Sequence, residues 1–137
     1  MKERNPKTIL LIEDDVGIVE MLQMVLEEEG YRVDTQTRCE EGFCLQWPFP
    51  DLILLDLLLT GMDGKTICQQ LKSQDATRHI PIIVMSASPN TAQIARDVGA
   101  DAWITKPFDI ERLLALLDTA WWPGYASNSQ NASALSW

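Results

Sequence analysis

Acidic, hydroxyl and amino side chains follow four short apolar segments of this sequence, at the point where each segment ends. These side chains are Glu13, Asp14, Asp56, Ser86 and Lys106. Clustered carboxylates repel one another, and hard oxygen ligands suit Mg²⁺, which commonly shares its ligands with phosphate groups. A carboxylate beside such an ion can attack a phosphoryl group, while an ammonium group and the metal neutralise the transferred charge. These residue types therefore indicate magnesium-assisted phosphoryl chemistry, provided that the fold brings them together.

Each of these residues also has an ordinary structural explanation. An Asp that precedes a helix, such as Asp14 or Asp15, often caps it, and Ser86 alone would be a turn residue. Lys106 alone would be a solvated charge. Asp56 is harder to explain in this way because it stands among leucines, where an unpaired carboxylate is costly. The coincidence of polar residues at four segment ends therefore favours a functional site.

The elements that would position these residues alternate between strand and helix five times. Apolar runs without polar alternation are typical of parallel strands that are buried on both faces. Strands are expected at 8–12, 31–35, 51–55, 81–85 and 101–104. Helices are expected at 15–29, 38–46, 64–73, 91–98 and 109–122. This order predicts an α/β fold with one parallel sheet, whose strand carboxyl ends share the edge where ligands bind.

Length, composition and charge narrow the class of protein. The 137 residues suit one domain, expected at 1–122, and the Ser- and Asn-rich segment 123–137 is expected to be a disordered tail. The net charge is −9, and the sequence has no excess of Lys and Arg that would bind the phosphate backbone of a nucleic acid. No DNA binding is therefore expected. The sequence shows no membrane-spanning run, no signal-peptide pattern and no C-x-x-C pair, which predicts a cytoplasmic protein with free thiols.

Four separated motifs appear in order along the chain. They are I-L-L-I-E-D-D at 9–15, D-L-I-L-L-D-L-L-L-T-G-M-D-G at 51–64, I-I-V-M-S-A at 82–87 and G-A-D-A-W-I-T-K-P-F at 99–108. Together they resemble the receiver domains of response regulators in two-component signalling, over about residues 7–122. The resemblance implies a flavodoxin-like (βα)5 doubly wound parallel sheet of five strands in the order 2-1-3-4-5. The chain resembles a single-domain receiver of the chemotaxis-regulator type.

The resemblance also implies a role for each candidate site residue. Asp56 matches the phosphoacceptor. Mg²⁺ would be held by Asp14, Asp56 and the main-chain carbonyl of Leu58, with Glu13 acting through water. The residues expected to bind the phosphoryl group and to switch with it are Ser86, Trp103 and Lys106. Those expected to tune the lifetime of the phosphorylated form are Leu58 and Ser88.

A few positions depart from the pattern of the family. Thr60 stands where receivers usually have Pro, and Trp103 replaces the usual Tyr or Phe. The helix expected at 91–98 is shorter than usual. Lys106-Pro107 matches a cis peptide bond of the family, and Asp15 is expected to point to solvent or to cap the helix that follows it.

The function implied is phosphorelay signal transduction. A sensor histidine kinase or a histidine phosphotransfer protein would phosphorylate Asp56 and so switch a surface formed by 91–98, 101–104 and 109–122, which a separate output protein would bind. The chain would not be an enzyme beyond its own phosphorylation and slow autodephosphorylation. One alternative is a degenerate receiver that acts as an unphosphorylated protein-binding module. Another is a haloacid-dehalogenase-like phosphatase, but Leu58 stands where its D-x-D-x-T motif needs the second Asp.

Overall fold

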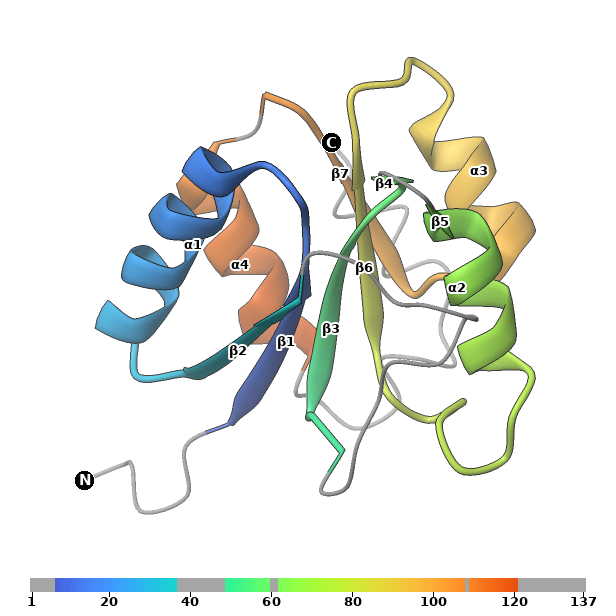
Figure 1. Cartoon of the computed structure of the whole chain (residues 1–137), viewed down its shortest axis with the longest axis horizontal. Helices are drawn as coiled ribbons and strands as arrows, with labels where there is room; N and C mark the ends of the chain where they lie inside the picture. The colour runs from blue at the N-terminus through green and yellow to red at the C-terminus, as the bar shows by residue number, and fades with distance from the viewer. Residues whose placement is uncertain (1–6, 37–48, 60–61, 108, 121–137) are drawn as a thin grey trace.

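A five-stranded parallel sheet forms the centre of the molecule (Figure 1). The computed structural model describes residues 7–36, 49–59, 62–107 and 109–120. The strands of the sheet are β1 (Thr8–Ile12), β2 (Arg32–Gln36), β3 (Leu52–Asp56), β6 (Ile82–Ser86) and β7 (Ala102–Thr105). Their spatial order is β2-β1-β3-β6-β7, which confirms the predicted order 2-1-3-4-5.

Helices cover both faces of this sheet. They are α1 (Val16–Glu28), α2 (Gly64–Lys72), α3 (Thr91–Val98) and α4 (Ile110–Ala120). In Figure 1, α1 and α4 lie on one face of the sheet, and α2 and α3 lie on the other. None of these helices, within the described part of the chain, has the length and apolar character needed to cross a membrane. The predicted helix at 38–46, residues 121–122 and the predicted tail at 123–137 lie outside the described residues.

Burial explains why the central strands read as continuous apolar runs. All five residues of β3 and all five of β6 are buried, because helices pack on both faces of the sheet. The edge strand β2 buries Val33 alone. The polar residues of the central strands, Asp56 and Ser86, are the last residues of β3 and β6, so the strands deliver them to the edge of the sheet.

Local capping sets where the helices begin and end. Asp15 caps α1 by accepting a hydrogen bond from the Ile18 amide at 3.0 Å, as the sequence predicted. Asp109 accepts one from the Glu111 amide at 2.9 Å at the start of α4. Gly30 and Gly99 follow α1 and α3 with φ of 97° and 83°, a left-handed backbone that favours glycine.

A short antiparallel hairpin follows β3 and was not predicted from the sequence. Its strands are β4 (Leu58–Leu59) and β5 (Met62–Asp63), with Leu58 paired to Asp63. Asp63 then caps α2 by accepting a hydrogen bond from the Lys65 amide at 3.0 Å. The hairpin therefore fixes the loop after Asp56 to the start of α2. Thr60, the predicted departure in this loop, lies outside the described residues.

Candidate functional site

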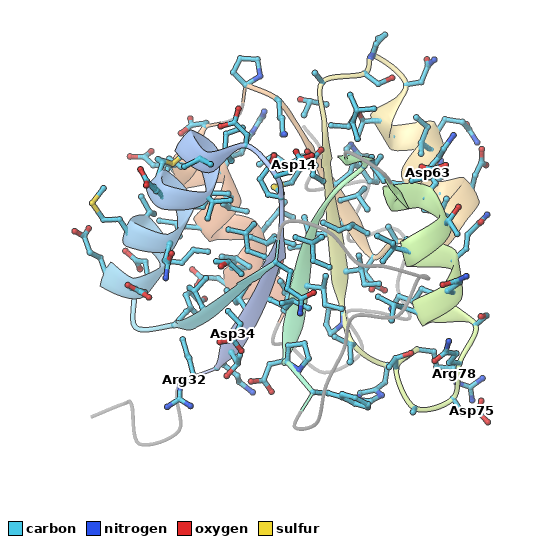
Figure 2. The ribbon with its side chains drawn as sticks, in the orientation of Figure 1. Asp14, Arg32, Asp34, Asp63, Asp75 and Arg78 are labelled. Atoms are coloured by element: carbon cyan, nitrogen blue, oxygen red, sulfur yellow. The ribbon has the colours of Figure 1, made fainter. Side chains whose placement is uncertain are left out.

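The carboxyl ends of four strands meet at one edge of the sheet. The register aligns Ile12 with Leu55, and Ser86 with Thr105, so the residues that follow β1 and β7 lie near the ends of β3 and β6. Figure 2 shows Asp14 at this edge, on the same side of the molecule as the start of α2. The predicted site residues at the strand ends are therefore neighbours in space.

Glu13, Asp14 and Asp56 form an acidic cluster. One carboxylate oxygen from each lies within 4.8 Å of the others. Glu13 is only 1% exposed and Asp56 only 4%, whereas Asp14 is partly exposed. Buried carboxylates at this spacing repel one another unless a cation lies beside them.

The ammonium group of Lys106 bridges two members of this cluster. Its Nζ lies 3.0 Å from Glu13 Oε1 and 3.3 Å from Asp56 Oδ2. Burial opposes the charge of Lys106, but the hydrogen bond with Glu13 and the charge of Asp56 outweigh it and raise the pKa above its usual value. Lys106 therefore stays protonated at neutral pH and is placed to neutralise charge at Asp56.

The carboxyl group of Glu13 is held in an unfavourable environment for its charge. Burial raises its pKa above the ordinary value, the hydrogen bond from Lys106 lowers it, and the nearby Asp56 raises it again. Glu13 Oε2 also accepts a hydrogen bond from the Asp15 amide at 3.2 Å, which fixes the turn between β1 and α1. Burial and the neighbouring Asp56 together therefore outweigh the lowering of this pKa by Lys106.

Backbone contacts hold the loop that carries Asp56. The Leu58 amide donates to Asp56 Oδ1 at 3.2 Å, and the Leu57 amide donates to the Met85 carbonyl at 2.9 Å. The Gly64 amide donates to the Leu57 carbonyl at 3.2 Å. A Cβ at Gly64 would lie against the main-chain oxygen of Asp56 and 2.7 Å from Leu57 Cα, so only glycine permits this approach. The start of α2 is thereby packed directly against the Asp56 loop.

Ser86 and Ser88 lie together at the end of β6. Ser86 is 8% exposed, and its hydroxyl oxygen accepts a hydrogen bond from the Ser88 amide at 3.0 Å. The Lys106 amide donates to the Ser86 carbonyl at 2.8 Å, which ties the segment after β7 to the end of β6. The Ser88 hydroxyl oxygen accepts from the Asn90 amide at 3.0 Å. The Lys106–Pro107 bond is cis, as the resemblance implied.

Trp103 and Leu58 differ sharply in exposure. Trp103, on β7, is 8% exposed and stands opposite Val84, two residues before the level of Ser86. The guanidinium carbon of Arg96 lies 5.6 Å from the centre of its ring. Leu58, two residues after the phosphoacceptor candidate, is 82% exposed. Sequence patterns did not single out Arg96 or Gly64, because their importance depends on contacts that only the fold creates.

The donor set at this edge fits a hard divalent cation. The cluster offers three carboxylates, two of which contact the Lys106 ammonium group, and all the ligand atoms are oxygens. Such a set suits Mg²⁺ better than a soft metal, which would favour thiolate ligands. The described cysteine, Cys68, is buried, and burial raises its pKa to about 12, so it does not provide a thiolate.

Known proteins with similar sequences are response regulators. The chain is 39% identical over 110 residues to the DNA-binding dual master transcriptional regulator RpaA of Synechocystis sp., covering 78% of this chain and 46% of that protein. It is equally similar to response regulator ArlR of Staphylococcus aureus, covering 78% of this chain and 49% of that protein. The chain thus spans about half the length of the curated relatives it matches.

Solved structures and a family profile agree with this similarity. A putative response regulator from Chloroflexus aurantiacus superposes with a TM-score of 0.78 at 29% identity, covering 85% of this chain and 98% of that one. Chemotaxis response regulator CheY4 of Vibrio cholerae superposes with a TM-score of 0.74 at 28% identity, covering 85% and 99%. The profile of the response regulator receiver domain matches residues 9–118. The chain therefore belongs to the response regulator receiver domain family.

Proposed function

We propose that this receiver domain accepts a phosphoryl group on Asp56 from a phosphohistidine side chain, in a reaction that needs Mg²⁺. The observation that carries this proposal is the position of Asp56. Its carboxylate is 4% exposed, ends the central strand β3, and lies between two further carboxylates and the Lys106 ammonium group. A carboxylate in such surroundings is well placed to act as a nucleophile and poorly explained as a structural residue.

The transfer exchanges one phosphorus bond for another. A carboxylate oxygen of Asp56 attacks the phosphorus atom, the O–P bond forms, the P–N bond to the imidazole breaks, and the imidazole nitrogen takes up a proton. The Leu58 amide donates a hydrogen bond to Asp56 Oδ1 and so orients the carboxylate. Lys106, beside Oδ2, neutralises charge on the incoming oxygens.

The metal would be held by the same edge of the sheet. Asp14, Asp56 and the Leu58 carbonyl are the proposed ligands, and Glu13 is proposed to act through water. When bound, the ion would neutralise charge on the phosphoryl oxygens and lower the repulsion between the carboxylates. The structural support is the oxygen-only donor set and the raised pKa of Glu13, whose charge is opposed both by burial and by the neighbouring Asp56.

Phosphorylation is proposed to act on the surface around α3, β7 and α4. The Ser86 hydroxyl would bind a phosphoryl oxygen, in exchange for or in addition to its contact with the Ser88 amide. Trp103 lies two residues from the end of β7, so a shift at Ser86 would reach it through the paired strands. Such a change biases an equilibrium between two arrangements of the surface.

Receiver domains are signalling modules that work with histidine kinases and output domains. For this chain we propose a histidine kinase or histidine phosphotransfer protein as donor and a separate output protein as target. The proposed limits are a receiver domain at 1–122 and a polar tail at 123–137. One relative, of which the match covers 46%, is named as DNA-binding, so the comparisons do not support the expected lack of DNA binding. That expectation remains a prediction from the net charge of −9.

Chemical trapping of the labelled residue tests this proposal. The protein is incubated with Mg²⁺ and phosphoramidate, a small donor with a P–N bond, and then reduced with borohydride, which converts an aspartyl phosphate to homoserine. Peptide mass spectrometry is expected to find homoserine at position 56. The matched control, Asp118→Asn, removes an exposed carboxylate on α4 and is expected to be labelled normally. Label on another residue, or an unlabelled protein as in a degenerate receiver, would overturn the proposal.

A further inference from the structure

The contact between Arg96 and Trp103 joins the exposed side of α3 to a buried aromatic ring. Arg96 is exposed in the last turn of α3, and its guanidinium carbon lies 5.6 Å from the centre of the Trp103 ring. Within the described part of the chain, Arg96 makes no ion pair with a carboxylate. No anion among the described residues therefore competes with the ring for the guanidinium group. Such cation–π contacts are attractive within about 6 Å.

The backbone fixes both partners of this contact. Ala95 and Val98 bury the inner side of α3, and the Gly99 amide donates to the Arg96 carbonyl at 3.3 Å. The Ala100 amide donates to the Ala95 carbonyl at 2.9 Å, so the turn into β7 is closed by hydrogen bonds. Arg96 thus stands above Trp103 because a tight turn returns the chain directly under the last turn of the helix.

We propose that Arg96 is a positioning residue that holds the Trp103 indole in its buried place and thereby couples the surface of α3 to the strand ends at the site. The positioning role does not depend on the proposed function, whereas the coupling to the site rests on it. Trp103 stands opposite Val84 on β6, and β6 ends at Ser86, whose carbonyl accepts a hydrogen bond from the Lys106 amide. A change at the Ser86 end that moves the Trp103 ring would have to break its contact with Arg96. Otherwise it would have to move the guanidinium group on α3 together with the ring.

The positioning role is tested without any phosphodonor. The protein is labelled with 5-fluorotryptophan, and the Trp103 resonance among the five tryptophans is assigned with Trp103→Phe. In Arg96→Gln the ratio of buried to exposed ring positions is expected to fall about two- to fivefold. This fall moves the resonance toward that of exposed fluorotryptophan and increases its shift between H₂O and D₂O. Arg96→Lys keeps a cation and is expected to lie between Arg96→Gln and wild type.

Arg32→Gln is the matched control, because it removes the same charge from an exposed site on β2. β2 and β7 are the two outermost strands of the sheet, on opposite sides of it. Arg32→Gln is expected to leave the Trp103 resonance unchanged. A Trp103 resonance in Arg96→Gln that matches wild type would overturn the positioning role. A resonance in Arg96→Lys that is displaced as far as in Arg96→Gln would overturn the role of the cation.

The coupling is tested after phosphoryl labelling. Arg96→Gln is expected to take up the phosphoryl group as wild type does, measured by intact mass. The labelling-induced shifts of the α3 backbone amides, measured by NMR, are expected to fall to about half or less. Equal amide shifts in the two proteins would overturn the coupling. Failure of the wild-type protein to take up label would instead count against the proposed function. The positioning role would still be decided by the fluorine measurement, which uses no phosphodonor.

Discussion

Glu13 and Asp56 share the ammonium group of Lys106 although both carboxylates are buried. Each loses most of its hydration, and one cation at 3.0 Å and 3.3 Å lowers but does not remove the cost. The raised pKa of Glu13 records this imbalance. An unfavourable charge cluster that the fold maintains is expected where a cation or a charged group is bound in function.

The first prediction concerns Glu13 and pH. Because the folded-state pKa of Glu13 is raised above 4.5, its ionisation destabilises the folded protein as pH rises from 4.5 through that folded pKa. The free energy of unfolding of Glu13→Gln relative to wild type should therefore increase over this window, by about 1.4 kcal/mol for each unit of pKa shift. Urea denaturation at several pH values, with a chelator present, measures it. A difference between the two proteins that is independent of pH would contradict the argument.

The second prediction concerns Leu58 and the lifetime of an aspartyl phosphate. The exposed Leu58 side chain has no polar group that could orient a water molecule toward phosphorus. The Ser88 hydroxyl, the other group expected to tune this lifetime, already accepts a hydrogen bond from the Asn90 amide. Leu58→Asn should therefore speed spontaneous dephosphorylation on the order of tenfold, since ordering a nucleophilic water is a large positioning effect. Leu58→Ala should speed it less. If Leu58→Asn lost phosphate no faster than wild type, shielding by Leu58 would be wrong.

At the scale of elements, α2 is held at both of its ends. Its start packs against the Asp56 loop through Gly64. Its last residue, Lys72, donates to the Arg78 and Ile80 carbonyls at 2.9 Å and 2.8 Å and pairs with Asp101 at 2.7 Å. Asp101 also accepts from the Ile82 amide at 2.8 Å, so this second set of contacts joins α2 to the starts of β6 and β7. The Gly64 anchor lies at the carboxyl ends of the strands and the Lys72 anchor at their amino ends. Figure 2 shows Arg78 at the end of the sheet away from Asp14.

Gly64→Ala tests the anchor at the site. The added methyl group has no room beside Asp56 and Leu57, so the backbone must shift, which typically costs about 1–3 kcal/mol. Gly17→Ala is the matched control, because a Cβ there meets only the Asp15 side chain, at 3.3 Å. That change should cost less than Gly64→Ala, because the contact is with a side-chain oxygen, which can shift, and not with the backbone. Thermal denaturation of both variants decides it, and equal stability of Gly64→Ala and Gly17→Ala would contradict the packing argument.

Lys72→Met tests the anchor at the opposite edge. Asp101, with its side chain 4% exposed, would keep a buried charge without its ammonium partner, which typically costs about 3–5 kcal/mol. Burial raises the pKa of Asp101, and Lys72 lowers it, so removing Lys72 should raise it further. The loss of stability should therefore shrink as pH falls and Asp101 becomes protonated. The double change Lys72→Met, Asp101→Asn should recover part of the stability in urea denaturation; no recovery would show that the unpaired charge is not the cause.

At the scale of the whole molecule, sequence patterns predicted the sheet well and the contacts between elements poorly. The apolar runs around 8–12, 51–55 and 81–85 are strong signals because these strands are buried on both faces, and each observed strand lies within one residue of its prediction. The hairpin after β3 has two-residue strands, too short for any periodic pattern. The contact between Arg96 and Trp103 could not be predicted from sequence patterns, because it depends on how tightly the chain turns from α3 into β7.

The candidate site shows the same division. Residue types at strand ends predicted which side chains meet, because parallel strands place their carboxyl ends at one edge. They did not predict that Lys106 bridges Glu13 and Asp56, nor that Gly64 packs against the Asp56 backbone, since these contacts join segments distant in sequence. The chemical groups therefore follow from the sequence, and their charge balance follows from the fold.

The rate of phosphoryl uptake, followed by intact mass, tests the central claim most directly. Wild type, Asp14→Ala and Asp56→Asn are each mixed with a small phosphodonor, with Mg²⁺ or with a chelator. Wild type should gain one phosphoryl group with Mg²⁺ and none with the chelator, because the acidic cluster is proposed to need the ion. Asp14→Ala should be labelled poorly under both conditions, and Asp56→Asn should not be labelled. An Asp56→Asn protein that gains a phosphoryl group at the wild-type rate would contradict the assignment of Asp56.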